Sequence, residues 1–389
     1  MTECALEDVC SYIVDCEHKT APIDEAGEYF AVGTPAMRGN AINLAESRRI
    51  NRATYDAWTR RLTPQHGDLL FAREAPVGPI VRIPPEENVA PGQRTVLIRP
   101  HPELADTGYL YYLLSSPIQQ SRISAAAAGS TVAHLNVADV RRFVLPPMPD
   151  IDEQRAIAEV LGALDDKIAA NTGLSASAED LILALARRGE ARCILADVAT
   201  RATKSVKPEA LGDAQVDHFS LPAYDGDRTP EAASADSIKS SKFALELPCV
   251  LLSKLNPRIP RIWDVVVLSG RPSLSSTEFI VLQPEQVSSS VLWAVLSQPN
   301  FMVELKGMVA GTSGSHQRVR PDDVMALEVT DPRFLSNETQ AAIRALGQTV
   351  AHVRQENEEL ARTRDALLPL LMSGKVTVKD AEAMVGEVV

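Results

Sequence analysis

The sequence lacks the features that mark a membrane or secreted protein. Its 389 residues contain no run of about 18 apolar residues, the length that a membrane-spanning helix needs. The first residues show no basic flank followed by an apolar stretch, so no secretory signal is predicted. The five cysteines form no CxxC pair, which favours reduced thiols in a cytoplasm. We expect a cytoplasmic protein without membrane association.

The motifs of common cofactor-binding and hydrolytic enzymes are also missing. There is no GxxxxGKS/T, no GxGxxG, no HExxH and no GxSxG. The seven histidines are scattered, and Cys4, Cys10 and Cys16 lie six residues apart, which is not a zinc-knuckle spacing. Cys16 with His18 could touch a metal, although a structural thiol is the favoured interpretation. We predict that this chain is not an enzyme and holds neither a metal nor a cofactor.

What the sequence does contain is a weak internal repeat. With 45% hydrophobic and 23% charged residues, the chain has globular composition and is long enough for two or three domains. Similar strings recur in the same order at shifts of 182 to 189 residues: 6–9 at 195–198, Phe30 at Phe219, 109–117 at 291–299, 129–134 at 311–316, and Asn171 at Asn357. Self-similarity of this kind indicates a repeated architecture. The chain is therefore predicted to consist of two similar halves.

Each half is predicted to contain a mixed region followed by a long helix. Strand-forming runs at 96–98, 143–145, 249–252 and 265–268 lie among Gly, Pro and Asp residues in the two mixed regions. We predict an α+β fold with four segments, at residues 1–150, 151–190, 191–335 and 336–389, of which the second is a helix and the fourth a helix with a tail.

The two helices carry narrow apolar stripes. Asp152 is a candidate cap for the first helix, and the second is predicted to begin near Ser336. The stripes comprise Ile157, Leu161, Leu164, Ile168, Ala178, Ile182 and Leu185, and then Ile343, Leu346, Val350, Val353, Leu360 and Leu367. Steps of three and four are typical of a coiled-coil seam, in which Asn171 and Asn357 can fix the register. We favour pairing of the two helices; packing of each on its own mixed region is the alternative.

The charge balance argues against nucleic-acid binding unless cations are clustered. The chain has 39 Lys+Arg and 51 Asp+Glu, a net charge of -12, and residues 151–190 are the most acidic segment. The mixed regions hold two basic clusters: Arg38, Arg48, Arg49, Arg52, Arg60 and Arg61, and then Lys239, Lys242, Lys254, Arg258 and Arg261. Such clusters suit phosphates and guanine edges, or a solvated face. One cluster in each half favours DNA.

Two glycine-containing loops, at 129–136 and 311–318, precede the strands that end the mixed regions. Together with nearby polar residues they offer candidate contacts to phosphates or base edges: Lys19, Arg73, His134, Asn136, Asn256, Ser315, His316, Gln317 and Arg318. Equally, the loops fit tight turns whose histidines satisfy buried carbonyl groups. Both interpretations stay open at this point.

The ordered motifs resemble those of the specificity subunit of type I restriction-modification systems. In the first half they are Gly67-Asp68-Leu69-Leu70 with Arg73, residues 129–136, and Pro146-Pro147 followed by Glu153-Gln154-Arg155. In the second half they are residues 253–257, Arg261-Ile262-Trp263, 276–279, 311–315 and 364–369. The second helix has Asn337-Glu338-Thr339-Gln340 where the first has Glu153-Gln154-Arg155.

The resemblance implies two target-recognition domains separated by a long antiparallel two-helix coiled coil, with a pseudo-twofold internal repeat. It implies that each domain recognises half of a split double-stranded DNA site. Two modification subunits, which carry S-adenosylmethionine and methylate adenine, are the implied partners, together with restriction subunits where present. Partner-binding residues carried over to this chain are Gln154, Arg155, Asn171, Asn357 and Arg364. About 35 helical residues span roughly 50 Å, on the order of 15 base pairs, which fits an unread spacer.

Two other functions are kept as alternatives. A scaffold of the same fold that does not recognise DNA would explain the acidic balance. An unrecognised hydrolase would use Ser313 or His316. If the chain does recognise DNA, its net charge predicts weak and salt-sensitive binding until partners supply further cations.

Overall fold

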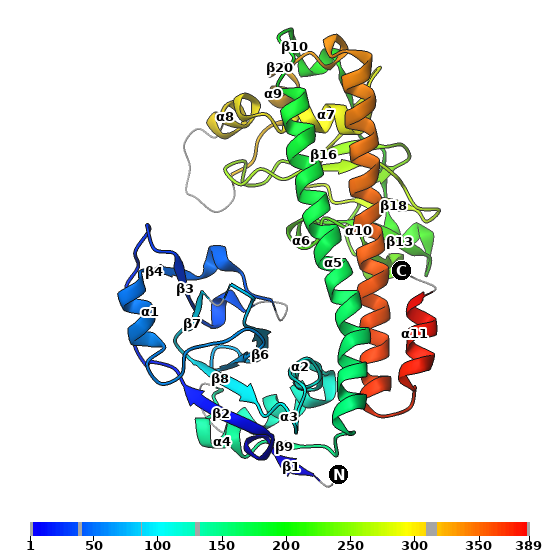
Figure 1. The fold of residues 1–389 in the computed structure, drawn as a ribbon. Helices are drawn as coiled ribbons and strands as arrows, with labels where there is room; N and C mark the ends of the chain where they lie inside the picture. Colours follow the sequence, from blue (N-terminus) through cyan, green and yellow to red (C-terminus); the bar gives the residue numbers. More distant parts are fainter. Residues whose placement is uncertain (1–2, 38–40, 87, 129–132, 309–316, 387–389) are drawn as a thin grey trace. The chain divides into compact units, whose positions relative to one another are not determined.

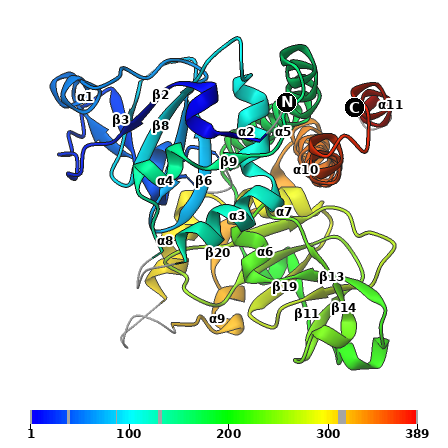
Figure 2. The same cartoon turned by 90° about the horizontal axis from the view of Figure 1, so that it is seen from below.

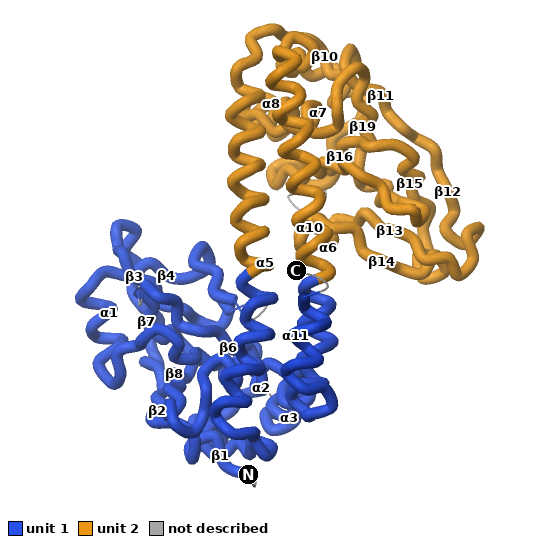
Figure 3. Tube along the Cα trace, turned by 45° about the vertical axis from the view of Figure 1, so that its right-hand side comes forward, with its two compact units in different colours: residues 1–166, 360–389 blue, residues 167–359 orange. Residues whose placement is uncertain are grey.

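The computed structural model describes residues 3–37, 41–86, 88–128, 133–308 and 317–386. It divides into two compact units, of which unit 1 comprises residues 1–166 and 360–389 and unit 2 comprises residues 167–359 (Figure 3). Two long helices of 36 residues each, α5 (Ile151–Ala186) and α10 (Asn337–Met372), contribute to both units. The division therefore passes through the helices, whereas the four predicted segments are divided near the helix ends.

Unit 1 begins with a mixed region of three small sheets (Figure 1). Its strands are β1 (Cys4–Ala5), β2 (Cys10–Asp15), β3 (Tyr29–Val32), β4 (Arg48–Ile50), β5 (Leu69–Arg73), β6 (Val77–Arg82), β7 (Val89–Pro91), β8 (Thr95–Pro100) and β9 (Val144–Leu145). The sheet orders are β2-β8-β5-β6, β4-β3-β7 and β1-β9. The helices are α1 (Arg52–Trp58), α2 (Thr107–Ser115), α3 (Pro117–Ala127), α4 (Val137–Arg141) and α11 (Val378–Gly386). Helix α11 runs beside the C-terminal part of α10 (Figures 1 and 2).

Unit 2 contains the second mixed region. Its strands are β10 (Arg192–Ile194), β11 (Ala199–Ala202), β12 (Ser205–Val206), β13 (Gln215–Phe219), β14 (Glu231–Ser234), β15 (Lys242–Leu245), β16 (Cys249–Ser253), β17 (Ile262–Val265), β18 (Ser273–Ser275), β19 (Phe279–Pro284) and β20 (Glu328–Thr330). The sheet orders are β11-β19-β16-β17, β12-β15-β18-β13-β14 and β10-β20. The helices are α6 (Leu221–Asp225), α7 (Ser289–Leu296), α8 (Pro299–Gly307) and α9 (Pro321–Met325).

The two mixed regions repeat the same strand pairing, which confirms the predicted internal repeat. The order β2-β8-β5-β6 in unit 1 corresponds to β11-β19-β16-β17 in unit 2, and both four-stranded sheets are antiparallel. Ala72 pairs with Thr95 as Ser253 pairs with Phe279. The parallel pair β3–β7 corresponds to β13–β18. Helices α2, α3 and α4 correspond in order to α7, α8 and α9.

Two details of the sequence-based repeat and strands were wrong. Phe219 corresponds to Val32 rather than to Phe30. Val32 pairs with Pro91 and Phe219 pairs with Ser275. Pro91 and Ser275 are equivalent, because each lies four residues before the first residue of the next strand, β8 or β19. The strand expected at 265–268 is β17, Ile262–Val265. Its partner β16 begins at Cys249, which pairs with Val265, so no backbone groups of β16 are left for the following residues. The remaining predicted runs fall on β8, β9 and β16.

The long helices begin where their capping groups lie. The carboxylate of Asp150 accepts hydrogen bonds from the backbone N–H groups of Asp152 and Glu153, at 3.1 and 2.9 Å. Asp150, and not Asp152 as predicted, therefore caps α5. Ser336 caps α10 as expected, because its hydroxyl accepts from the N–H of Thr339 at 3.1 Å.

Antiparallel pairing of α5 with α10 is visible inside each unit. In unit 1, Arg364 of α10 donates to Asp165 of α5 at 2.6 Å. In unit 2, Asn171 of α5 donates to Asn357 of α10 at 3.0 Å, so the two seam asparagines meet. The stripes also reach the mixed regions, as Ile182 and Ile343 belong to the apolar core of unit 2. The two packing alternatives of the sequence are thus both realised, over different parts of each helix.

Small residues let a short helix approach each long helix closely. In unit 1, a Cβ atom on Gly108 of α2 would lie 2.9 Å from the Cβ of Ala158 in α5. In unit 2, a Cβ on Gly347 of α10 would lie 2.0 Å from the hydroxyl of Ser290 in α7. Gln154, fully buried, accepts from the N–H of Asp106 and donates to the carbonyl of Pro149, and Gln340 donates similarly to Leu335. The same helix-docking arrangement therefore occurs in both halves.

Candidate nucleic-acid interface

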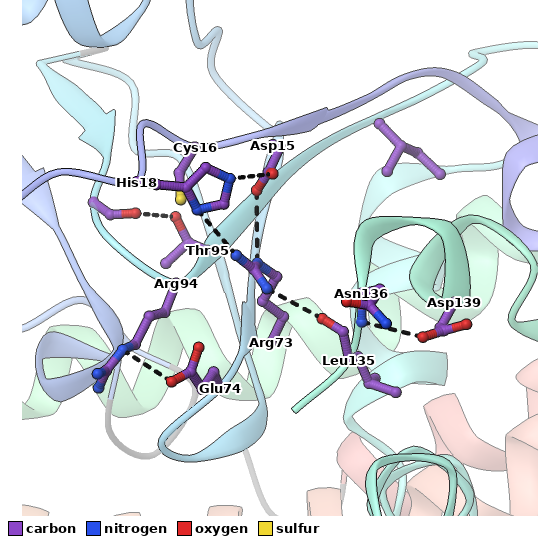
Figure 4. A network of polar contacts seen from close by, with 12 residues as sticks. Asp15, Cys16, His18, Arg73, Glu74, Arg94, Thr95, Leu135, Asn136 and Asp139 are labelled. Atoms are coloured by element: carbon purple, nitrogen blue, oxygen red, sulfur yellow. Dashed lines mark hydrogen bonds and ion pairs between the residues drawn. The ribbon is translucent and has the colours of Figure 1, made fainter. Parts of the chain in front are cut away.

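Three chain segments meet in unit 1 beyond the end of its four-stranded sheet (Figure 4). They are the end of β5 at Arg73 and Glu74, the turn before β8 at Arg94, and the segment before α4 at residues 134–136. The N–H of Arg73 donates to the carbonyl of Arg94 at 3.0 Å, and the N–H of Leu135 donates to the carbonyl of Arg73 at 2.9 Å. Glu74 and His134 form a β-bridge. We call this meeting point junction 1.

Arg73 holds junction 1 together from inside. It is 9% exposed, and its guanidinium donates to the carbonyl of Leu135 at 3.3 Å. The same group lies 3.3 Å from the ring Nδ1 of His18 and 3.6 Å from the carboxylate of Asp15 (Figure 4). His18 in turn contacts Asp15 through its Nε2 at 2.8 Å. Arg73, predicted as a DNA-contacting residue, has its donors directed at partners within unit 1.

The same network bears on a metal site. Asp15, Cys16 and His18 bring possible ligand atoms within 4.8 Å of one another. However, the cationic Arg73 contacts both Asp15 and His18, and a divalent cation would have to displace it. Burial also raises the pKa of the Cys16 thiol, which disfavours the thiolate that binds metals. These contacts favour an arginine-centred structural network, in line with the interpretation of Cys16 as a structural thiol.

Unit 2 has the same junction, built from equivalent residues. The N–H of Lys254 donates to the carbonyl of Glu278 at 2.8 Å, and the N–H of Val319 donates to the carbonyl of Lys254 at 3.1 Å. Leu255 and Arg318 form the β-bridge. Lys254, Glu278 and Arg318 therefore occupy the places of Arg73, Arg94 and His134. We call this meeting point junction 2.

A shared backbone conformation supports this equivalence. Ala75 in unit 1 and Asn256 in unit 2 both precede a proline and adopt the left-handed region, with φ of 50° and 51°. Asn256 also donates its N–H to the carbonyl of Gln317 at 3.0 Å. Junction 2 thus brings together four residues that were predicted separately as DNA contacts: Lys254, Asn256, Gln317 and Arg318.

Each junction carries an ion pair between an arginine and a glutamate, but the two pairs are formed by different segments of the junction. In unit 1, Arg94 of the turn before β8 pairs with Glu74 after β5, at 3.4 Å. In unit 2, the turn before β19 supplies Glu278, whose two carboxylate oxygens accept from Nε and Nη2 of Arg318, both at 3.0 Å. The hydrogen bonds from Arg318 hold the pKa of Glu278 below its usual range.

A concavity of about 890 Å³ adjoins junction 1. Arg94, Gln93, Arg48 and Arg49 contribute to its lining, together with Thr20 and the apolar Phe30, Pro35 and Leu44. Arg48 and Arg49 lie on β4, whose equivalent positions on β14 are Glu231 and Ala232. The concavity therefore presents cationic and amide donors in unit 1, beside Glu25 and Glu46, and the positions equivalent to Arg48 and Arg49 in unit 2 are not basic.

Some of the other predicted DNA-contacting residues have their side chains engaged by neighbouring groups, and others are exposed. Arg52 pairs with Asp56 and Arg60 with Glu17, and the guanidinium of Arg61 donates to the carbonyls of Asp15 and Cys16. In unit 2, Arg261 is held by Asp225 at 2.6 Å, Lys239 donates to the carbonyl of Asp236, and Lys242 is buried and donates to Ser240. Burial lowers the pKa of Lys242 and of Lys254. Lys19, Arg48, Arg49, Asn136 and Arg258 are exposed. Arg38, Ser315 and His316, with Ser313, lie outside the described residues.

Among the predicted partner-binding residues, Arg155 is exposed and pairs with Asp152 at 3.2 Å. Gln154, Asn171, Asn357 and Arg364 all make the internal contacts given above. Sequence reasoning did not predict Gln93, Arg94, Glu74 or Glu278 as contact residues, although residues 276–279 were among the motifs of the resemblance. Arg94 and Glu278 both lie in the turn just before a strand, β8 or β19. This shared position could have marked them as equivalent residues, but it is recognised only when the strand registers of the two units are aligned.

Comparison with known proteins agrees with this architecture. Residues 3–180 match the family model described as the type I restriction modification DNA specificity domain. The crystal structure of a type I restriction-modification S subunit from M. genitalium has a TM-score of 0.62 at 16% identity, covering 95% of this chain and 96% of that one. The HsdS subunit from Thermoanaerobacter tengcongensis has a TM-score of 0.36 at 16% identity, covering 96% and 97%.

A shorter match involves a protein from Mycoplasma genitalium described as a type I specificity subunit. It is 35% identical over 63 residues, so that the match spans 16% of this chain and 16% of that protein. By its fold, the chain is an α+β protein with two repeated units that share two long helices, the architecture of the M. genitalium S subunit. Residues 3–180 are thus similar to the type I restriction modification DNA specificity domain, and the fold of the whole chain is similar to that of the M. genitalium S subunit.

Within the described part of the chain, no helix has both the length and the apolar character needed to cross a bilayer.

Proposed function

We propose that this chain is the DNA-recognition subunit of a type I restriction-modification complex, and that each unit recognises one half of a bipartite double-stranded site. The observation that carries the proposal is the repeat of the junction: the same three segments meet by the same backbone hydrogen bonds in both units. The side chains around the two junctions differ, as Arg94 against Glu278 and Arg48 against Glu231 illustrate. A repeated frame with different side chains suits two half-sites of different sequence.

The long helices support a spacer between the half-sites. Each helix belongs to unit 1 at one end and to unit 2 at the other. A helix of 36 residues is roughly 54 Å long, which matches on the order of 15 base pairs. The bases between the two half-sites would then be left unread.

We assign the methylation and cleavage of DNA to partner subunits rather than to this chain. In this proposal two modification subunits bind the chain in the cytoplasm, hold S-adenosylmethionine and methylate adenine in each half-site, and restriction subunits, where present, cleave the DNA. The chain itself holds no cofactor. Its net charge of -12 supports this division, because a subunit with more acidic than basic residues needs partners to add phosphate contacts.

The test is methylome sequencing of a bacterial host that expresses the full chain together with candidate modification subunits. We expect adenine methylation in one bipartite motif, which disappears when this chain is omitted. A second measurement is the affinity of the assembled complex for duplex DNA as a function of salt. Absence of a motif, together with no salt dependence, would indicate the scaffold function instead, and hydrolysis by the chain alone would indicate an enzyme.

A further inference from the structure

Within the described residues, the ion pair at each junction leaves the outer edge of its arginine without a partner. In unit 2, Glu278 engages the Nε and Nη2 atoms of Arg318, which form one edge of the planar guanidinium. The side chain of Arg318 remains 50% exposed. Its Nη1 atom and the second hydrogen of Nη2 make no contact with Glu278, and together they form the edge that suits a pair of adjacent acceptors.

Unit 1 has a comparable ion pair, which is formed by a different pair of junction segments. The Nε atom of Arg94 faces Glu74 at 3.4 Å, and the side chain of Arg94 is 44% exposed (Figure 4). The carboxylates are similarly sheltered, with 28% exposure for Glu74 and 31% for Glu278. Arg94 also lines the concavity that contains Gln93 and Arg48.

The backbone at Arg94 gives a further indication. Its φ of 71° lies in the left-handed region, which a bulky residue such as arginine adopts rarely. Such conformations persist where the surrounding structure holds them, and they cluster at functional sites. Here the carbonyl of Arg94 is held by the N–H of Arg73, and the neighbouring Cys16 and Thr95 are paired through the backbone.

A surface ion pair alone contributes little to stability, which makes a purely structural role for both pairs a weak explanation. The two pairs occupy equivalent junctions but are formed by different segments, so the feature that both junctions share is an arginine whose Nε faces a glutamate. A buttressed guanidinium is pre-oriented, because the carboxylate restricts the rotamers that the free side chain would sample. Guanine presents adjacent O6 and N7 acceptors in the major groove, and a bidentate arginine is their commonest partner.

We propose that Arg94 and Arg318 each recognise a guanine, one in each half-site, and that Glu74 and Glu278 are positioning residues that orient them. The inference rests on the proposed function and identifies which residues of each unit set the base preference. The bidentate contact requires the fork of an arginine, so a lysine at either position cannot replace it.

The test compares methylomes of hosts that express the modification subunits with the wild-type chain or with single variants. The wild-type motif is expected to contain a fixed guanine in each half-site. Arg318→Gln should reduce the preference for guanine at one position of one half-site by about tenfold or more, and Arg94→Gln should do so in the other half-site. Arg318→Lys should behave like Arg318→Gln, and Glu278→Gln should weaken the preference at the same position as Arg318→Gln.

Arg142→Gln serves as the matched control, since Arg142 is paired with Asp139 at 3.4 Å on the surface of unit 1, outside the junction. It should leave the motif unchanged. Co-purification of each variant with the modification subunits checks folding, and Glu278→Gln and Glu74→Gln, which keep both arginines, cover the case in which an arginine variant does not fold.

The inference is overturned if the wild-type motif lacks a fixed guanine in either half, or if the arginine variants leave the motif unchanged. An equal loss of methylation at all sequences would also overturn it, because that result indicates a phosphate contact. If the wild-type chain directs no bipartite motif at all, the proposed function fails instead, so the two failures are distinguishable.

Discussion

Asn171 and Asn357 are hydrogen bonded to each other at 3.0 Å, and each is the twenty-first residue of its 36-residue helix. Asn171 also donates to Glu356 at 2.7 Å, and Asn357 donates to the carbonyl of Ile168 at 3.3 Å. Equivalent residues of the internal repeat therefore contact each other in the apolar seam. A polar pair at this place costs some stability but specifies one register, because any slip would bury an amide without a partner.

Replacing one seam asparagine should be more harmful than replacing both. Asn171→Leu leaves the carboxamide oxygen of Asn357 without its donor, so we expect the free energy of unfolding to fall by about 1–2 kcal/mol. The double variant Asn171→Leu with Asn357→Leu should recover most of this loss, since two leucines can pack together. Urea unfolding followed by the helical circular dichroism signal measures the effect. Strictly additive losses would contradict the pairing.

The stability of unit 2 should depend on the protonation of Asp264. Burial raises the pKa of this carboxyl group to about 6, although the hydroxyls of Ser290 and Ser289 and the charge of Arg354 partly oppose the shift. Because the folded-state pKa lies above the unfolded value of about 3.9, the folded protein binds the proton more tightly. This contribution is fully present below pH about 4, and it is lost as the pH rises through about 6.

In the wild-type protein, the free energy of unfolding should therefore fall by about 3 kcal/mol as the pH rises through this range. Asp264→Asn should abolish this fall. Denaturant unfolding at a series of pH values checks the expectation. Asp213→Asn, at an exposed position of the same unit, is the control and should keep the wild-type pH profile. A profile of Asp264→Asn that parallels the wild type would show that this carboxyl group does not titrate as described.

The contact between α7 and α10 should tolerate no side chain at Gly347. A Cβ at this position would lie 2.0 Å from the hydroxyl of Ser290 and 2.7 Å from its Cβ, so Gly347→Ala should destabilise the protein by about 1–3 kcal/mol. Ser290→Gly in the same chain should restore part of the loss. Gly173→Ala is the matched helix control: nothing lies within 4 Å of its Cβ position, so it should stabilise by about 1 kcal/mol. Thermal unfolding distinguishes these cases.

Two arginines of the same sequence cluster should differ in their effect on DNA binding. Arg48 is exposed, and its side chain makes no hydrogen bond or ion pair with another residue in the described part of the chain. Arg48→Gln should lower the slope of log affinity against log salt by about 1, with similar weakening for all sequences. Arg61 donates to two backbone carbonyls, so Arg61→Gln should lower thermal stability and leave the slope nearly unchanged. Fluorescence anisotropy of the assembled complex with a labelled duplex measures both slopes. Equal slopes for Arg48→Gln and the wild type would contradict a phosphate contact.

The sequence predicted the two halves, the long helices and the pairing of these helices with each other, because these features depend on patterns that are local or regular along the chain. Steps of three and four apolar residues identify a seam whatever surrounds it, and Asn171 and Asn357 interrupt both seams at matching places. The resemblance to a known family predicted the domain arrangement and the function in more detail than the residue patterns alone. The start of α5 and the extent of β17 were misjudged, since the first depends on which carboxylate reaches the free N–H groups and the second on where its partner strand begins.

The sequence by itself therefore determined the repeat, the helical seam and the basic character of residues 38–61. Only the tertiary structure decided which charged residues meet. Arg73 was predicted to contact DNA but is buried against Asp15 and His18, whereas Arg94, which lines the concavity, was not among the predicted contacts. The physical reason is that strand pairing over long sequence distances sets these neighbours. Glu278 and Arg318 lie 40 residues apart in the chain, and no pattern along it indicates that they form one ion pair.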